Sequence, residues 1–153
     1  MKFEDYFSIK GTYEFVDGVY NVKGFADLIK KVEKLPVKFG IVTGNFYCTH
    51  NNLTSLEGAP TQVGGFFYCY HNKLTSLKCA PTQVGGSFCC YNNSLTSLKG
   101  SPKSVGGNFF CHNNNLTSLE GIPSSICGNF ICDKNLHDTK EYKQYLIMKE
   151  LRK

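Results

Sequence analysis

Long apolar runs are missing from this 153-residue chain, and so is any dense block of one charge. No apolar stretch approaches the roughly 20 residues that a bilayer-spanning helix needs, so the sequence does not predict a membrane protein. Residues 1–10 mix charged and aromatic side chains and lack the pattern of a secretion signal. The formal charge of +5 is spread over both ends and the repeat turns, which does not indicate nucleic-acid binding. We expect a cytoplasmic protein with one domain.

The cysteine spacing of a disulfide scaffold is also missing, although the chain holds eight cysteines. Small disulfide scaffolds place their cysteines at irregular, loop-borne spacings. In this chain five of the eight cysteines recur every 21 residues, at Cys48, Cys69, Cys90, Cys111 and Cys132. Thiols in such a row all point one way, which suits neither the geometry of a disulfide nor the four converging ligands of zinc. We expect the row to be buried, reduced and space-filling, and Cys89 to face outward.

A 21-residue repeat organises most of the chain. The segment Leu-Thr-Ser-Leu begins at Leu53, Leu74, Leu95 and Leu116. Each of these segments is followed by a proline and by a β-branched residue three places later. A glycine pair comes next at Gly64-Gly65, Gly85-Gly86 and Gly106-Gly107, and weakens to Cys127-Gly128 in the last unit. The glycine pairs indicate backbone angles that other residues avoid, and the prolines disfavour a helix on the outer side of the coil. That side is expected to be turn-like.

A short strand motif, Phe-x-Cys-x-x-Asn, follows each glycine pair. Because alternate side chains of a strand face opposite sides, the Phe and Cys of each motif should point into a core shared by stacked coils. The recurring asparagines should bond the backbone of the turns and act as scaffold. They are Asn51, Asn72, Asn93, Asn114 and Asn135.

Taken from the strand onward, each unit is F-x-C-x-x-N-x-L-T-S-L, the leucine-rich-repeat segment with Phe and Cys in places usually held by leucine. The chain resembles the short, helix-poor leucine-rich-repeat proteins of tailed bacteriophages, and more distantly the repeat domains of bacterial effectors. The resemblance implies a binding protein, and a role such as blocking a host defence protein in the host cytoplasm.

The fold that the sequence predicts is a β-rich solenoid of 21-residue coils with a parallel concave sheet. We divide it into an N-terminal cap and degenerate first coil near Phe25 (1–31), the repeats (32–136) and a C-terminal cap (137–153). An Asp-Gly turn at Asp17-Gly18 joins Tyr13–Val16 to Val19–Val22 in a predicted β-hairpin. Asp138, with Glu141 three residues on, predicts the start of a capping helix with an apolar side.

The outward strand positions of the first four repeats are rich in aromatic residues. Aromatic residues favour strands in general, but a contiguous exposed apolar surface often marks an interaction site, and tyrosine is a frequent anchor. The sequence therefore predicts a non-enzymatic protein that binds and occludes a partner protein. The expected anchors are Tyr47, Phe66, Tyr68, Tyr70, Tyr91 and Phe110, with His50, His71, Asn92 and His112 as polar residues at the rim.

Two other classes of function stay open. Aromatic side chains could stack the bases of a nucleotide or single strand, but the outward columns hold almost no Lys or Arg. An enzyme using a metal or a thiol would need converging His and Cys side chains, and His50 with His71 supplies only two ligands. No catalytic triad, carboxylate pair or phosphate loop can be assembled from the sequence, and no cofactor is expected.

Overall fold

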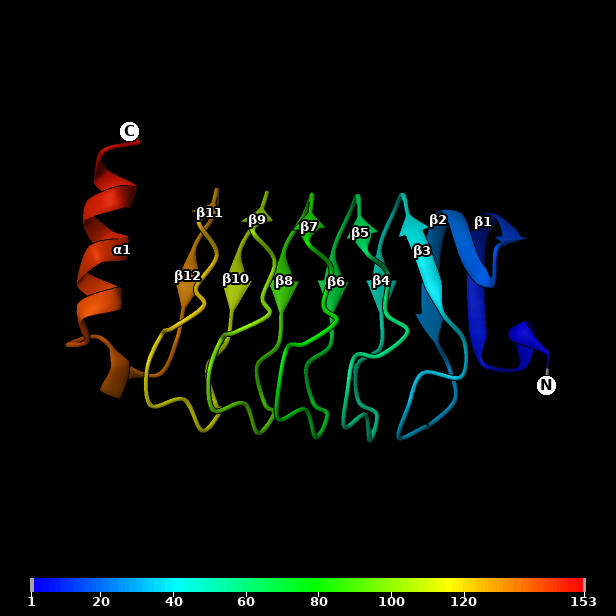
Figure 1. Ribbon diagram of the computed structural model, residues 1–153, viewed down its shortest axis with the longest axis horizontal. Helices are drawn as coiled ribbons and strands as arrows, with labels where there is room; N and C mark the ends of the chain where they lie inside the picture. Colours follow the sequence, from blue (N-terminus) through cyan, green and yellow to red (C-terminus); the bar gives the residue numbers. More distant parts are fainter. Residues whose placement is uncertain (1, 153) are drawn as a thin grey trace.

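The computed structural model describes residues 2–152 and shows a solenoid of about five coils with a hairpin at one end and a helix at the other (Figure 1). The N-terminal part contains η1 (Phe3–Asp5), β1 (Phe7–Val16), β2 (Val19–Leu28) and β3 (Phe39–Val42). The C-terminal part contains η2 (Lys134–Leu136) and α1 (Lys140–Glu150). Neither end has a helix with the length and apolar character that crossing a membrane requires, within the described residues.

Each coil contributes two short strands, which stack into two parallel ladders. The first ladder holds the predicted Phe-x-Cys strands: β4 (Phe46–Tyr47), β6 (Phe67–Tyr68), β8 (Phe88–Cys89), β10 (Phe109–Phe110) and β12 (Phe130–Ile131). The second ladder continues from β3 and lies on the side that the sequence predicts to be turn-like: β5 (Gln62–Val63), β7 (Gln83–Val84), β9 (Ser104–Val105) and β11 (Ser125–Ile126). The long strand β2 pairs with both β3 and β4 and so joins the ladders into one sheet.

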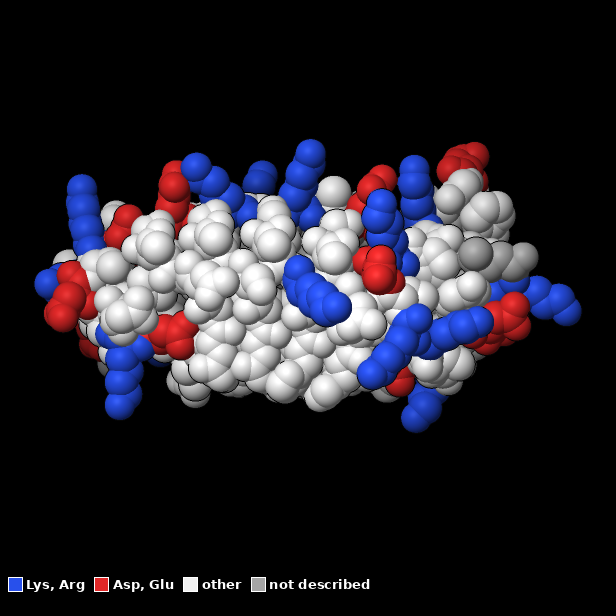
Figure 2. All heavy atoms as spheres, turned by 90° about the horizontal axis from the view of Figure 1, so that it is seen from below, with Lys and Arg blue, Asp and Glu red and all other residues white. Residues whose placement is uncertain are grey.

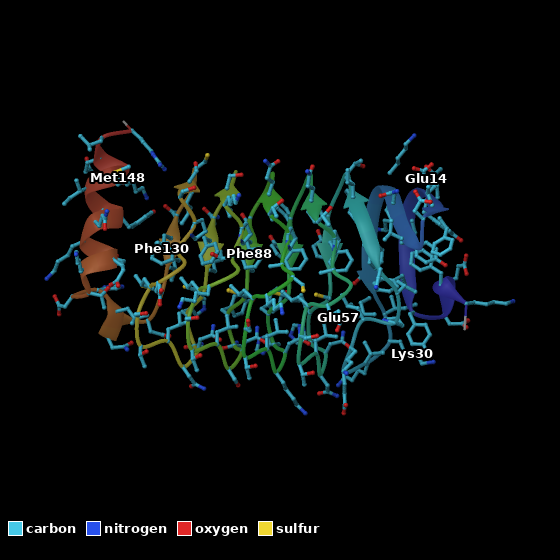
Figure 3. All side chains as sticks on the ribbon, in the orientation of Figure 1. Glu14, Lys30, Glu57, Phe88, Phe130 and Met148 are labelled. Atoms are coloured by element: carbon cyan, nitrogen blue, oxygen red, sulfur yellow. The ribbon has the colours of Figure 1, made fainter. Side chains whose placement is uncertain are left out.

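The core is a set of columns in which the same repeat position stacks from coil to coil. The phenylalanine rings of Phe67, Phe88 and Phe109 lie parallel, with centroids 5.3 Å apart at each step. Figure 3 shows Phe88 and Phe130 inside the coils. The Leu-Thr-Ser-Leu leucines and the five periodic cysteines are also buried, which confirms the inward side of the strand motif.

The glycine pairs are required for a different reason from the one that the sequence suggests. None of the six glycines in the three pairs adopts a positive φ. Instead, a Cβ atom on Gly64, Gly85 or Gly106 would lie 2.1 Å from a backbone carbonyl oxygen of the preceding coil. The first glycine of each pair therefore permits close backbone stacking. The second leaves room for a side chain of the preceding coil, as where Phe66 lies over Gly86.

The asparagine row ties neighbouring coils together, as expected of a scaffold. The Asn72 Oδ1 atom accepts the Leu53 N–H of the preceding coil at 2.9 Å, while its Nδ2 donates to the carbonyls of Cys48 and Cys69. Asn51, Asn93 and Asn114 also accept a backbone N–H of the preceding coil. The expectation for Asn135 is wrong, because this residue is exposed within η2.

The hairpin caps the first coil and is longer than the sequence predicts. Its two strands pair in a regular antiparallel register from Phe7 opposite Leu28 to Val16 opposite Val19. The degenerate first coil is shifted by one residue from the expected position at Phe25. Ala26 pairs with Phe46 and occupies the inward place, whereas Phe25 is 42% exposed and lies over Gly44.

The C-terminal helix begins one residue later than expected. Its N-cap is Thr139, whose Oγ1 accepts the N–H of Tyr142, and not Asp138. The helix packs on the last coil through rings, since Tyr145 meets Phe130 edge-on with centroids 4.9 Å apart. The rest of its predicted apolar side stays largely exposed: Leu146, Ile147, Met148 and Leu151.

Candidate functional site

The six predicted anchors lie on the outward side of the first ladder and its flanks. We call this surface the aromatic face and define it as Tyr47, Phe66, Tyr68, Tyr70, Tyr91 and Phe110. Tyr47 and Tyr68 are in register in β4 and β6, and Phe110 lies two strands further along the same row. Phe66 is 40% exposed and the other five are half-buried. The structure therefore brings all six to one side of the sheet.

Except for Phe110, the rings of the aromatic face contact one another in two rows. In one row Tyr70 stacks on Tyr91 with centroids 4.5 Å apart, and Tyr91 stacks on His112 at 4.8 Å, each pair within 8° of parallel. In the other, Tyr47 and Tyr68 are 5.4 Å apart. A contact of 5.8 Å between Tyr68 and Tyr70 connects the rows. Such ring pairs fix side-chain orientation, so the face is ordered before any partner arrives.

Charge is scarce on this side of the molecule. Among the outward strand positions of the five described coils, only Asp133 in the last one is charged. Partial burial raises the pKa of Tyr68, and it raises the pKa of Tyr91 to about 12. Figure 2, which views the turns from below, shows most charges along one long edge and at both ends, with a few between them. The raised pKa values keep the hydroxyls of Tyr68 and Tyr91 as neutral donors and acceptors at physiological pH.

The four predicted rim residues fall into two groups. His50, His71 and Asn92 occupy the same repeat position and share a left-handed backbone with φ between 52° and 54°. His and Asn are among the few non-glycine residues that accept this conformation. The His50 and His71 rings stack at 4.5 Å, and Asn92 Nδ2 contacts His71 Nε2 at 3.0 Å. His112 instead extends the Tyr70–Tyr91 stack, and its buried Nδ1 has no hydrogen-bond partner among the described residues.

Cys89 faces outward as the sequence predicts, but it is not exposed to solvent. Its side chain does lie on the outward side of the strand, in register with Tyr68 and Phe110, but it is only 4% exposed. A small side chain between two large ones in the same row is covered by them. Burial also raises the pKa of the Cys89 thiol to about 12, which suppresses the reactive thiolate.

Thiol labelling tests this placement. In the native protein we expect a thiol reagent to modify the exposed Cys79 and Cys127 quickly. Cys89 and the five-membered cysteine row should react only on unfolding, because all six are buried. Mass spectrometry of digested, labelled protein would identify the sites, with denatured protein as the control. Fast modification of Cys89 would show that the aromatic face is looser than its ring contacts indicate.

Across positions 2–152, no group of three or more His, Cys, Asp or Glu side chains has a metal-binding arrangement. Comparison of the chain with protein-family models, with curated proteins and with solved structures finds no match.

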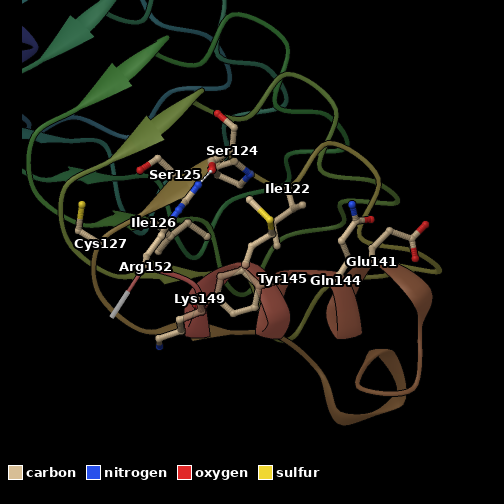
Figure 4. A pocket seen from close by; sticks show the side chains of 12 residues that line it. Ile122, Ser124, Ser125, Ile126, Cys127, Glu141, Gln144, Tyr145, Lys149 and Arg152 are labelled. Carbon is tan, nitrogen blue, oxygen red and sulfur yellow. Dashed lines mark hydrogen bonds between the residues drawn. The ribbon is translucent and has the colours of Figure 1, made fainter.

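A groove that the sequence did not indicate lies between the last coil and α1 (Figure 4). This groove has a volume of about 600 Å³ and is lined in part by Ile122, Ile126, Tyr145 and Met148. Arg152 crosses it and donates from Nη2 to the Ser124 carbonyl at 2.6 Å. The sequence contains only one sign of this groove, the apolar residues of α1. They were interpreted as one side of a capping helix.

Proposed function

We propose that this chain is a non-enzymatic binding protein that covers a surface of a partner protein with its aromatic face. The observation that carries the proposal is a connected set of partly exposed rings on the side of the first ladder that the core does not use. The buried columns are complete without these side chains. Large apolar side chains that a fold does not need for its own packing are typical of recognition surfaces.

The order of the face supports protein binding over base stacking. Tyr70, Tyr91 and His112 cover one another's ring faces, so a base has no space between them and would meet mainly ring edges and hydroxyls. A binder of single strands would also need a basic groove along the face. Preorganised tyrosines on a face with little charge suit an uncharged protein surface, because little side-chain entropy is lost on binding.

A finer proposal concerns the partner. The resemblance to bacteriophage repeat proteins suggests a bacterial host protein, such as a defence factor, that is blocked by occlusion in the host cytoplasm. This part rests on the resemblance alone, since a fold does not specify a function. Site-specific photocrosslinking from Phe66 in a host lysate would test it, with a crosslinker at Gln83 on the second ladder as the matched control.

Truncating two central anchors should remove most of the affinity for a partner identified in this way. We expect Tyr68→Ala with Tyr70→Ala to weaken binding by about thirtyfold or more, the usual effect of losing an interface anchor. The two changes also remove ring stacking, so the free energy of unfolding should fall by about 1–2 kcal/mol. Calorimetric titration and urea denaturation would separate the two effects.

The control places alanines at Lys78 and Lys99, which are distant from the aromatic face in the repeat. This variant should bind as the natural sequence does. If the lysine variant loses affinity and the tyrosine variant does not, recognition occurs on the other side of the solenoid and the proposed site is wrong.

A further inference from the structure

The outer edge of β1 is the longest unpaired strand edge in the described chain. β1 is the outermost strand at the N-terminal end (Figure 1) and pairs only with β2. Every residue from Lys10 to Gly18 is exposed, including Tyr13 at 42%, Phe15 at 60% and Val16 at 46%. An exposed and partly apolar edge of this length, with extended backbone except for the positive φ of Gly11, is a template for another strand.

The hydrogen bonds show which residues of β1 face outward. In an antiparallel pair, residues alternate between bonding to the partner strand and pointing away from it. The β2 residues opposite Ile9, Gly11 and Phe15 use their N–H groups on the other side, toward Asn45, Thr43 and Lys38. The odd-numbered residues of β1 therefore direct their own N–H and C=O groups outward into solvent.

This edge is complementary to itself. If two copies pair antiparallel about a twofold axis at Thr12, odd residues meet odd residues, as the free hydrogen-bonding groups require. Lys10 of each copy then lies opposite Glu14 of the other, which places two pairs of opposite charge across the junction. Other registers that also place odd residues opposite odd residues lose this pairing of Lys10 with Glu14. A twofold axis at Gly11 pairs Lys10 with Thr12, and an axis at Lys10 opposes two lysines.

The side chains on the opposite side of the strand also fit this register. Gly11 lies opposite Tyr13, so the tyrosine ring, which packs on Phe3 and Tyr20 within its own copy, meets no side chain at the opposed position of the other copy. Ile9 lies opposite Phe15, whose ring otherwise contacts only Tyr20 among the aromatic residues of the described chain. Opposed apolar side chains of this kind stabilise neighbouring antiparallel strands.

We propose that two copies of this chain associate through their β1 edges in the register centred on Thr12, forming one continuous sheet across two solenoids. The twofold axis leaves both aromatic faces outside the junction, because they lie on the coils beyond β2. The dimer would therefore present two binding surfaces. This inference does not depend on what the aromatic face binds.

A designed disulfide tests the register. Facing Thr12 residues would form a non-hydrogen-bonded pair with Cα atoms about 4.5 Å apart, within the range that a disulfide spans. We expect Thr12→Cys to give a covalent dimer under mild oxidation in a background where the exposed Cys79 and Cys127 are replaced by glycine. Glycine stands at the equivalent positions of other repeats, so these replacements suit the backbone.

Ser8→Cys is the matched control, because it lies on the same side of the same strand. Its two copies would be separated by eight residues along the sheet, about 27 Å, and should crosslink at least tenfold more slowly. Equal crosslinking of the two variants, or none from Thr12→Cys, would overturn the proposal.

Reversing the charges provides a second, non-covalent test by analytical ultracentrifugation. Lys10→Glu and Glu14→Lys each place two like-charged pairs across the junction and should raise the dimer Kd roughly tenfold. Mixing the two variants restores opposite charges in a heterodimer, so association should recover. Lys78→Glu should have no effect. A monomeric natural sequence at the highest attainable concentration, or a mixture no better than its components, would contradict the proposed dimer.

Discussion

Replacing Phe88 by alanine should lower the free energy of unfolding by about 3–5 kcal/mol, the usual cost of removing a buried phenylalanine ring. Phe88 is fully buried and stacks on Phe67 and Phe109, so the cavity would open in the middle of a continuous column. Neighbouring coils cannot close around it, because both ladders hold their spacing. Urea denaturation followed by circular dichroism would measure the loss.

Phe110→Ala is the matched control on the outward side. Its ring is only half-buried, so removing it should lower the free energy of unfolding by about 1–2 kcal/mol. Equal losses at the two positions would show that Phe88 is not held in a rigid column.

Adding a single methyl group at Gly85 should destabilise the protein nearly as much as Phe88→Ala. We expect Gly85→Ala to lower the free energy of unfolding by about 3 kcal/mol or more. The added Cβ would lie 2.1 Å from the Gly64 carbonyl oxygen, and a backbone atom cannot rotate away as a side chain can. Relief requires two coils to move apart, which strains the bonds of both ladders. The same denaturation experiment would measure this loss.

Gly18→Ala separates steric stacking from backbone strain. Gly18 has a φ of +81°, but no atom lies within 4 Å of the place that an alanine methyl group would take, so only the left-handed backbone penalty applies. That penalty is about 1–2 kcal/mol. If Gly85→Ala cost no more than Gly18→Ala, the coils would be able to separate without loss of stability.

The sequence predicted the solenoid because its strongest feature is a period, and a period fixes which residues share a column. The inward positions of Phe67, Cys69 and Leu74 followed from strand alternation and from the apolar pattern. The second ladder could not be predicted in the same way. Its strands are two residues long, as at Gln62–Val63, and depend on pairing with the next coil rather than on any local preference.

Exposure was harder to predict than direction. Alternation placed Cys89 correctly on the outward side, but its burial depends on the sizes of Tyr68 and Phe110 in the adjacent coils. The role of the glycine pairs was missed for a similar reason, since the distance between stacked backbones is not a local property. The helix start moved from Asp138 to Thr139 because both residues can cap, and packing of the preceding turn decides between them.

For the candidate site, the sequence predicted which aromatic residues share a surface but not how they stack. It also grouped His112 with His50 and His71, although His112 belongs to the tyrosine stack and the other two occupy a left-handed turn position. Both turn histidines therefore have a conformational reason to be there, which the pattern alone did not reveal.

The repeated coil also determines how the molecule would respond to mechanical tension. Each coil contacts mainly its two neighbours, so a force applied between the ends would detach coils singly from an exposed end of the stack. Every detached coil would release the same 21 residues, which add about 70 Å of extended chain. The hairpin, which spans both ladders through β2, would resist longest, and the solenoid would lengthen in equal steps toward it.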